Sequence, residues 1–277
     1  MIVNDFVISS KTNDFVKMAV SLQEKKYRTG YGLFLADGIK LTLECAAANL
    51  PVDYIVISED RLGEYLDSIK SAFSSSLYAS TRIVRVTGDV FQKISSEKSP
   101  QGVISLVKRL DFFRNVNIIY KEEFFLPRGE RALALCSLRD PTNLGAVIRS
   151  AAAFGVRHII LSADCSDVYN PRTVRSAMGS MFKVKISVVS DFAEFVRVAR
   201  QVGRRVFAAE LREGAVPLSS VSLNGDDIFV IGNEGHGIPE EISSLCDKSV
   251  YIPISENVES LNASVASALF MWEQSKV

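Results

Sequence analysis

From Ala132 to the end of the chain, short apolar segments alternate with segments of helical periodicity, and this pattern constrains the fold more than any other feature. The apolar segments have the length of strands, and their near-continuous apolar character is typical of strands that are buried on both faces. They are ALALCSL, HIILS, KISVV, VFAAEL, DIFVIG and VYIPI. Strands of this kind separated by helices predict a mostly parallel α/β sheet covered by helices on both sides.

The first part of the chain predicts a second, smaller α/β unit. Thr12 to Lys26 has helical periodicity, and GLFLADG, DYIVIS and RIVRV have the character of strands. The stretch 109–131 breaks the alternation, mixes aromatic with charged residues, and has Pro127 and Gly129 near its end. We therefore predict domains at 1–108 and 132–277, joined by a linker at 109–131.

Composition narrows the class of protein. The 277 residues are 47% hydrophobic and 23% charged, as expected for a chain that forms a core, and the formal net charge is zero. A neutral chain does not coat nucleic acid through a global positive field. The N-terminus lacks the features of a signal peptide, and no apolar run is long enough to span a bilayer. We expect a cytoplasmic protein that does not enter a membrane.

The cysteines and histidines do not form a recognisable chemical motif. No CxxC pair occurs, and the four cysteines are far apart, which favours reduced, core-packed thiols over zinc or disulfides. We interpret both histidines as structural, so we expect no metal site. The residues concerned are Cys45, Cys136, Cys165, Cys246, His158 and His236.

Ligands of parallel sheets gather at the carboxyl ends of the strands, so the loops there are the candidate sites. The first such loop, DPTNLG, leads into a helix that we expect from Asn143 to Phe154, with Asn143 as its cap and Gly155 at its end. Arg149 lies about 9 Å further along the helix axis and is long enough to reach back to the loop. A solvent-facing, snorkelling Arg149 is the alternative.

The second loop, GNEGHG, contains three glycines in six residues and includes Glu234. Its spacing is neither the GxGxxG dinucleotide fingerprint nor the GxxxxGK[ST] phosphate loop. Glycines permit positive φ and close approach of a ligand to the backbone. By itself, this loop is weak evidence for a binding site.

The third loop lies in the stretch Tyr251–Trp272 and includes Ser260, Leu261 and Asn262. We expect Ser260 to open the last helix, and a capping role for these polar residues is the alternative to a catalytic one. The three loops contain no activated nucleophile, paired carboxylates or metal cluster, which favours positioning and electrostatics over covalent chemistry.

Taken together, the loops resemble three motifs of the SpoU/TrmH-type RNA ribose 2′-O-methyltransferases of the SPOUT superfamily. The segments DPTNLGAVIRSAAAFG, IGNEGHGIP and YIPISENVESLNASVA are similar to the three motifs, in the same order. NPRTVRSAMGSMF is similar to the family's segment between the first two. Residues 7–105, with KKYRTGYGLFLADGIKL, resemble its N-terminal substrate-binding domain, so the resemblance covers nearly the whole chain.

The resemblance implies a deep trefoil knot in the C-terminal domain, S-adenosyl-L-methionine as cofactor, and a homodimer. The positions that match the family's catalytic residues are Asn143, Arg149, Glu234, Ser260 and Asn262. We assign the cofactor site to Ala209, Gly232, Asn233, Gly235, Ile252 and Leu261. A guanidinium stays protonated, so we interpret Arg149 as binding a phosphate and polarising the hydroxyl, with Asn143 and Glu234 holding it.

RNA is the expected partner, and rRNA is the expected substrate by analogy with the family's two-domain members. We expect Lys25, Lys26 and Arg28 to contact RNA, and a merely solvated helix end is the alternative. A tRNA 2′-O-methyltransferase and a non-catalytic RNA-binding protein stay open as alternatives. An oxidoreductase or nucleotide hydrolase needs a phosphate-loop spacing that the chain lacks.

Overall fold

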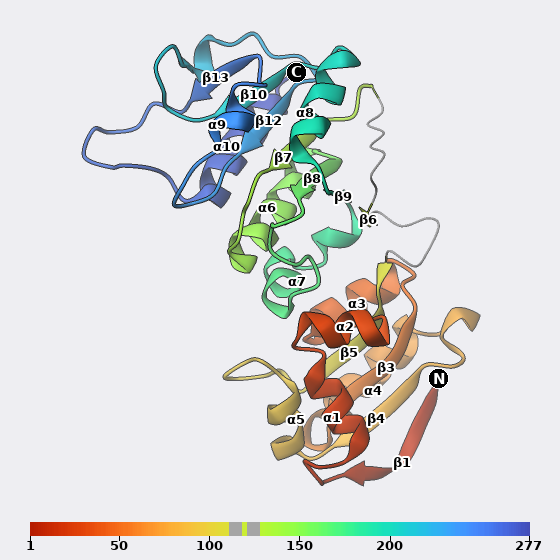
Figure 1. Cartoon of the computed structure of the whole chain (residues 1–277). Coiled ribbons are helices and arrows are strands. Elements are labelled where there is room, and N and C mark those ends of the chain that lie inside the picture. The colour runs from red at the N-terminus through yellow and green to blue at the C-terminus, as the bar shows by residue number, and fades with distance from the viewer. Residues whose placement is uncertain (111–117, 121–127) are drawn as a thin grey trace. The chain divides into compact units, whose positions relative to one another are not determined.

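The computed structural model describes residues 1–110, 118–120 and 128–277. The chain forms two compact units, each with its own β-sheet (Figure 1). One unit consists of Met1–Phe112 and Asp167–Gly179, and the other of Phe113–Ser166 and Ser180–Val277. The division at residues 108 and 131 stays a prediction, and most of the expected linker lies outside the described residues.

The first unit contains a mixed five-stranded sheet in the order β1-β4-β3-β5-β2. β4 pairs in parallel with β1 and β3, whereas β5 pairs antiparallel with β2 and β3. The strands are β1 (Ile2–Ile8), β2 (Leu33–Asp37), β3 (Val52–Ser58), β4 (Arg82–Val86) and β5 (Val103–Lys108). The helices are α1 (Asp14–Ser21), α2 (Lys25–Tyr31), α3 (Ile39–Ala47), α4 (Leu62–Ala72), α5 (Gly88–Ile94) and α7 (Pro171–Ala177).

The helix expected over Thr12 to Lys26 is divided into α1 and α2, so this expectation is wrong. Asn13 caps α1 by accepting a hydrogen bond from the backbone N–H of Phe15 at 2.9 Å. Between the helices, Leu22 is fully buried and the side chain of Gln23 donates to the carbonyl of Ile94 at 2.9 Å. These tertiary contacts end the helix where the local sequence has no glycine or proline to signal it.

The second unit contains an eight-stranded sheet in the order β11-β13-β10-β12-β7-β8-β9-β6, in which every neighbouring pair is parallel. Its strands are β6 (Ile118–Tyr120), β7 (Ala132–Leu135), β8 (His158–Ser162), β9 (Lys185–Val189), β10 (Val206–Ala209), β11 (Val216–Pro217), β12 (Ile228–Ile231) and β13 (Lys248–Tyr251). β7, β8 and β12 are buried along their whole length. The predicted parallel α/β sheet is confirmed, while the trefoil knot stays a prediction.

Helices cover both faces of this sheet. On one face, α8 (Phe192–Gln201) and α9 (Glu240–Ser243) pack against the strands in one apolar cluster that includes Val196 and Ile242. On the other face, Phe270 of α10 (Ala263–Gln274) stacks on Phe229 of β12, with ring centroids 4.8 Å apart. α6 (Pro141–Phe154) packs beside α10. The strand ends that carry the candidate loops are thus held by two apolar layers.

None of the helices in the described ranges is both long and apolar enough to cross a membrane.

Candidate functional site

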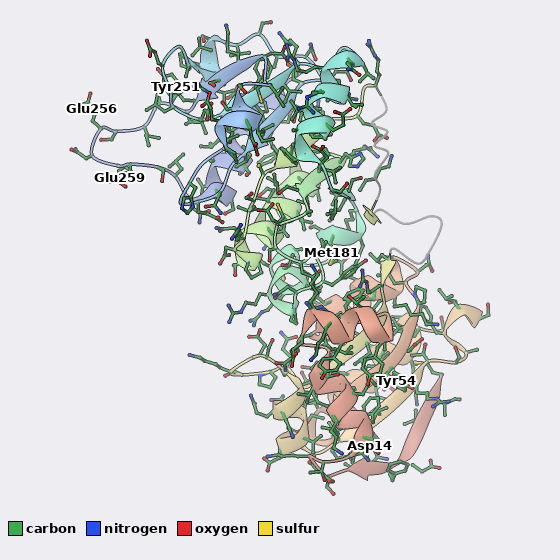
Figure 2. All side chains as sticks on the ribbon, in the orientation of Figure 1. Asp14, Tyr54, Met181, Tyr251, Glu256 and Glu259 are labelled. Atoms are coloured by element: carbon green, nitrogen blue, oxygen red, sulfur yellow. The ribbon has the colours of Figure 1, made fainter. Side chains whose placement is uncertain are left out.

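A pocket of about 780 Å³ opens in the second unit at the carboxyl ends of β10, β12 and β13. Its volume lies in the range of small-molecule sites, roughly 300–1,000 Å³. The pocket is lined by every residue assigned from the sequence to a cofactor, namely Ala209, Gly232, Asn233, Gly235, Ile252 and Leu261. In Figure 2 the chain leaves Tyr251 as a loop that carries Glu256 and Glu259 away from the sheet before α10 begins.

The glycine-rich loop after β12 depends on close backbone packing. A Cβ atom on Gly232 would lie 2.3 Å from the carbonyl carbon of Gly237, so only glycine fits without a backbone shift. Asn233 and Gly237 exchange backbone hydrogen bonds of 2.9 and 3.0 Å. The Asn233 side chain donates to the carbonyl of Ser137 at 2.8 Å and accepts from the backbone N–H of Gly235 at 2.9 Å. Asn233 therefore fixes the loop through its side chain.

Three of the predicted catalytic residues are connected by hydrogen bonds, although each comes from a different loop. Asn262 Nδ2 donates to Asn143 Oδ1 at 3.0 Å. Asn143 Nδ2 in turn donates to Glu234 Oε1 at 2.9 Å. Each donor faces an acceptor, so these two hydrogen bonds fix the orientation of the side-chain amides of Asn143 and Asn262. The hydrogen bonds hold the starts of α6 and α10 against the glycine-rich loop beside the pocket.

The structure corrects the start of α6. Its N-cap is Asp140, which accepts from the backbone N–H of Asn143 at 2.8 Å, and Pro141 occupies the first turn. Asn143 therefore does not cap the helix, and its side chain is available for Asn262 and Glu234. The expected end is correct, because Gly155 closes the helix with φ +71°.

The start of α10 is also corrected. Its N-cap is Asn262 rather than Ser260, and Asn262 Oδ1 accepts from the backbone N–H groups of Ser264 at 2.9 Å and Val265 at 3.4 Å. One end of the Asn262 amide thus caps the helix while the other donates to Asn143. Ser260 is exposed and lines the pocket.

Arg149 is not part of the hydrogen-bonded chain. Its side chain is exposed on α6, and within the described residues it makes no hydrogen bond or ion pair. The expected contact of Arg149 with Asn143 and Glu234 is therefore missing from this structure. An exposed and unpaired guanidinium remains able to bind an external anion.

Glu210 is a pocket residue that the sequence analysis missed. It follows β10 directly, and its Oε1 accepts from Ser249 Oγ at 2.7 Å and also from Ser243 Oγ. Its position immediately after Ala209, at the end of an expected strand, is the sequence signal that indicates Glu210 as a pocket residue. Glu210 adds a partly buried carboxylate to a pocket that is also lined by the exposed carboxylates of Glu234 and Glu259.

The thiols are poor nucleophiles. Burial raises the pKa of Cys136 to about 11 and that of Cys246 to about 12, so both are neutral at pH 7. Among the residues described, no group of three or more His, Cys, Asp or Glu side chains lies in position to hold a metal ion. The site therefore offers a shaped pocket and fixed amides, and Arg149 is not among the residues that line the pocket.

The residues predicted to contact RNA lie in the first unit and differ in exposure. Lys25 and Lys26 are exposed on α2. Arg28 is only 2% exposed, and its guanidinium donates to the carbonyls of Leu22 and Gln23 and pairs with Asp167. The expected RNA contact of Arg28 is corrected, because a buried and paired guanidinium is not available to a phosphate. Lys25 and Lys26 keep this role as a prediction.

Comparisons with known proteins match both parts of the chain to family models. Residues 130–272 match the SpoU rRNA Methylase family. Residues 13–105 match the MRM3-like substrate binding domain. The three candidate loops all lie within the first of these matches.

Similar proteins with curated names include two bacterial enzymes. The 23S rRNA (guanosine(2553)-2′-O)-methyltransferase RlmP of Bacillus subtilis is 26% identical over 96% of this chain and 97% of its own length. The 23S rRNA (guanosine-2′-O-)-methyltransferase RlmB of Acinetobacter baylyi is 31% identical over 69% of this chain and 77% of its own. Among solved structures, an AdoMet-bound rRNA methyltransferase from Sinorhizobium meliloti gives a TM-score of 0.83 at 26% identity, over 99% of this chain and 98% of that one.

Proposed function

The chain belongs to the SpoU rRNA methylase family, and we propose that it transfers a methyl group from S-adenosyl-L-methionine to a ribose 2′-hydroxyl of ribosomal RNA. The observation that carries this proposal is the pocket of about 780 Å³ at three strand ends, with the hydrogen-bonded chain of Asn262, Asn143 and Glu234 beside it. Relatives that act on 23S rRNA favour rRNA over tRNA as the substrate.

The pocket residues fit the cofactor. Gly232 brings backbone close to the pocket wall, Ile252 and Leu261 supply apolar surface, and Glu210 supplies a carboxylate that can accept from hydroxyl groups. When bound, S-adenosyl-L-methionine supplies a methyl group on a positively charged sulfur, which is open to attack by an oxygen. Binding and orientation are the contribution of these residues, since the reaction needs the attacking oxygen and the methyl group to be in line.

Arg149 binds the phosphate next to the target ribose and polarises the 2′-hydroxyl. Its guanidinium stays protonated, so it donates hydrogen bonds and does not take up the proton. Asn143, Asn262 and Glu234 act on the loop geometry, because their side chains bond to one another and not to Arg149. Ser260, exposed at the pocket rim, orients the ribose.

The protein acts as a homodimer through the outer face of α10. Val265, Leu269 and Trp272 lie at i, i+4 and i+7 on this helix and are 48%, 39% and 49% exposed. A second copy would bury this apolar stripe, which supports a symmetric interface. Sedimentation of Leu269→Glu tests this point, since a monomer is expected for the variant and an unchanged dimer would contradict the assignment.

Mapping of 2′-O-methyl marks in total RNA, with and without the gene, tests the function. We expect one or a few marks in rRNA to disappear with the gene. Loss of a tRNA mark would favour the tRNA alternative, and unchanged marks would favour a non-catalytic RNA-binding protein.

The rRNA methyltransferase relatives in bacteria also support a cytoplasmic location.

A further inference from the structure

α2 is held to the first unit in an unusual way. Arg28 is the one buried side chain of this seven-residue helix, and no apolar side chain of the helix is buried. The guanidinium donates from Nη1 to the carbonyls of Leu22 and Gln23 at 2.9 and 2.8 Å, and from Nη2 to Asp167. Because this anchor is charged and buried, it fixes the orientation of the helix and leaves the other side chains outside.

The two lysines of α2 are placed unfavourably with respect to the helix dipole. Lys25 and Lys26 occupy its first turn, where the helix dipole favours acidic side chains and disfavours cations. Within the described residues neither lysine pairs with a carboxylate, and Lys26 Nζ lies 4.6 Å from the centre of the Tyr27 ring. Two cations that have no carboxylate partner among the described residues are complementary to an external anion.

Two tyrosines stand on the outer face of the same helix. Tyr27 and Tyr31 are 36% and 53% exposed and are four residues apart, so their rings lie on one side of the helix. Gly30 lies on that side too, and a Cβ atom there would meet nothing within 4 Å. The glycine leaves open space on this face of α2, three residues beyond Tyr27. Figure 1 shows the course of α2 in the first unit.

We propose that Lys25, Lys26, Tyr27 and Tyr31 form a platform that binds an unpaired segment of RNA, with bases stacked on the tyrosine rings and phosphates at the lysines. This inference rests on the proposed function, which makes RNA the substrate, and it names the class of RNA structure that the first unit selects. A duplex hides the faces of its bases, whereas a single strand can present them to aromatic side chains.

The charge and shape of the surface favour RNA over a protein partner. Lysines beside exposed aromatic rings match the alternation of phosphate and base along a single strand. A protein interface of useful size requires a larger apolar core than two half-exposed rings provide. The platform is therefore assigned to nucleic acid, and a protein partner is one outcome of the test.

Fluorescence anisotropy with a labelled oligoadenylate RNA of about 12 nucleotides, compared with an RNA duplex of the same length, tests the platform. We expect the single strand to bind more tightly. Tyr27→Leu combined with Tyr31→Leu is expected to weaken single-strand binding by roughly tenfold or more, because each stacked ring contributes to affinity. Phe6→Leu, which removes a 62% exposed aromatic ring from β1 of the same unit, is the matched control.

Two further variants separate charge from shape. Lys25→Gln combined with Lys26→Gln is expected to lower the slope of log affinity against log salt by roughly 1.4, since each single-strand phosphate contact contributes about 0.7. Lys70→Gln, at an exposed position on α4, is the control. Gly30→Leu adds a side chain on this face at a position where a Cβ atom meets nothing within 4 Å. It is expected to weaken single-strand binding while the melting temperature is retained.

The outcomes distinguish this inference from the proposed function. Equal affinity for single strand and duplex, or unchanged binding by the double tyrosine variant, would overturn the platform. A double tyrosine variant that binds RNA normally but changes its self-association would assign the face to a protein interface instead. If the tyrosines govern oligoadenylate binding but the wild-type protein methylates no rRNA, the platform stands and the proposed function fails.

Discussion

Asn262 donates from its side-chain Nδ2 to Oδ1 of Asn143 at 3.0 Å, across 119 positions of the chain. The same amide accepts backbone hydrogen bonds through Oδ1 at the start of α10. One residue therefore determines where the last helix begins and how the three candidate loops are joined. Asn143 extends the connection to Glu234.

Substitution of Asn262 separates these two roles. Asn262→Asp keeps the capping oxygens, so the free energy of unfolding should change little. The rate of methyl transfer should fall by about tenfold or more, because Asn143 Oδ1 loses its donor. A carboxylate at position 262 can only accept, and it can do so only from an Asn143 amide that has turned away from Glu234. Asn262→Ala loses the cap as well and should lower the free energy of unfolding by about 1 kcal/mol. Urea unfolding measures the free energy of unfolding of each variant, and a turnover assay measures its rate of methyl transfer. A normal rate for Asn262→Asp would contradict the positioning role.

The sequence was sufficient to place the three loops together. Parallel strands present their carboxyl ends at one edge of a sheet, so Asn143, Glu234 and Asn262 were expected to meet there, and their hydrogen bonds show that they do. The predicted helix starts are wrong because Asp140 and Asn262 are about as good N-caps as Asn143 and Ser260, so residue type alone does not select among them. Local rules apply at these positions, but several residues compete for the same role.

Other features depend on contacts that are distant in sequence. Arg28 was expected to face solvent, and it is buried because it pairs with Asp167, 139 positions away. Asp167 lies in a segment that packs with the first unit although it follows β8 of the second. Periodicity within a window of residues carries no information about such a partner.

Gly232→Ala tests the backbone packing of the pocket wall. The new methyl group would lie 2.3 Å from the carbonyl carbon of Gly237, so the loop must shift. We expect the affinity for S-adenosyl-L-methionine, measured by calorimetry, to fall by about tenfold or more, because overpacking of this kind costs about 1–3 kcal/mol. Gly225→Ala is the control, since a Cβ atom there meets nothing within 4 Å. Equal cofactor affinity of both variants would contradict the assignment of this wall.

Arg149→Lys tests the phosphate-binding role. Lysine keeps the charge but loses the two-pronged hydrogen bonding of the guanidinium, so the rate should fall by roughly a hundredfold while cofactor affinity is retained. Arg157→Lys makes the same change at an exposed position just beyond α6 and should leave the rate unchanged. Near-normal turnover of Arg149→Lys would exclude the role.

The buried side chain of His158 should make the free energy of unfolding depend on pH. Burial, reinforced by the nearby Lys185, lowers its pKa from 6.5 to about 4. Between pH 6.5 and about 4, His158 is therefore protonated in the unfolded chain but neutral in the folded chain. The free energy of unfolding falls as the pH is lowered through this range, by at most about 3 kcal/mol. Urea unfolding at several pH values should show a flatter dependence for His158→Gln, with His236→Gln as the control. An unchanged slope for His158→Gln would contradict this assignment.

Transfer of labelled methyl groups from S-adenosyl-L-methionine to rRNA purified from cells without the gene, followed by nucleoside analysis, tests the central claim most directly. We predict that the wild-type protein yields a labelled 2′-O-methylnucleoside and that Asn262→Asp, while still folded, yields far less. Label on a base, or no label in rRNA with a folded protein that binds the cofactor, would contradict the proposed function.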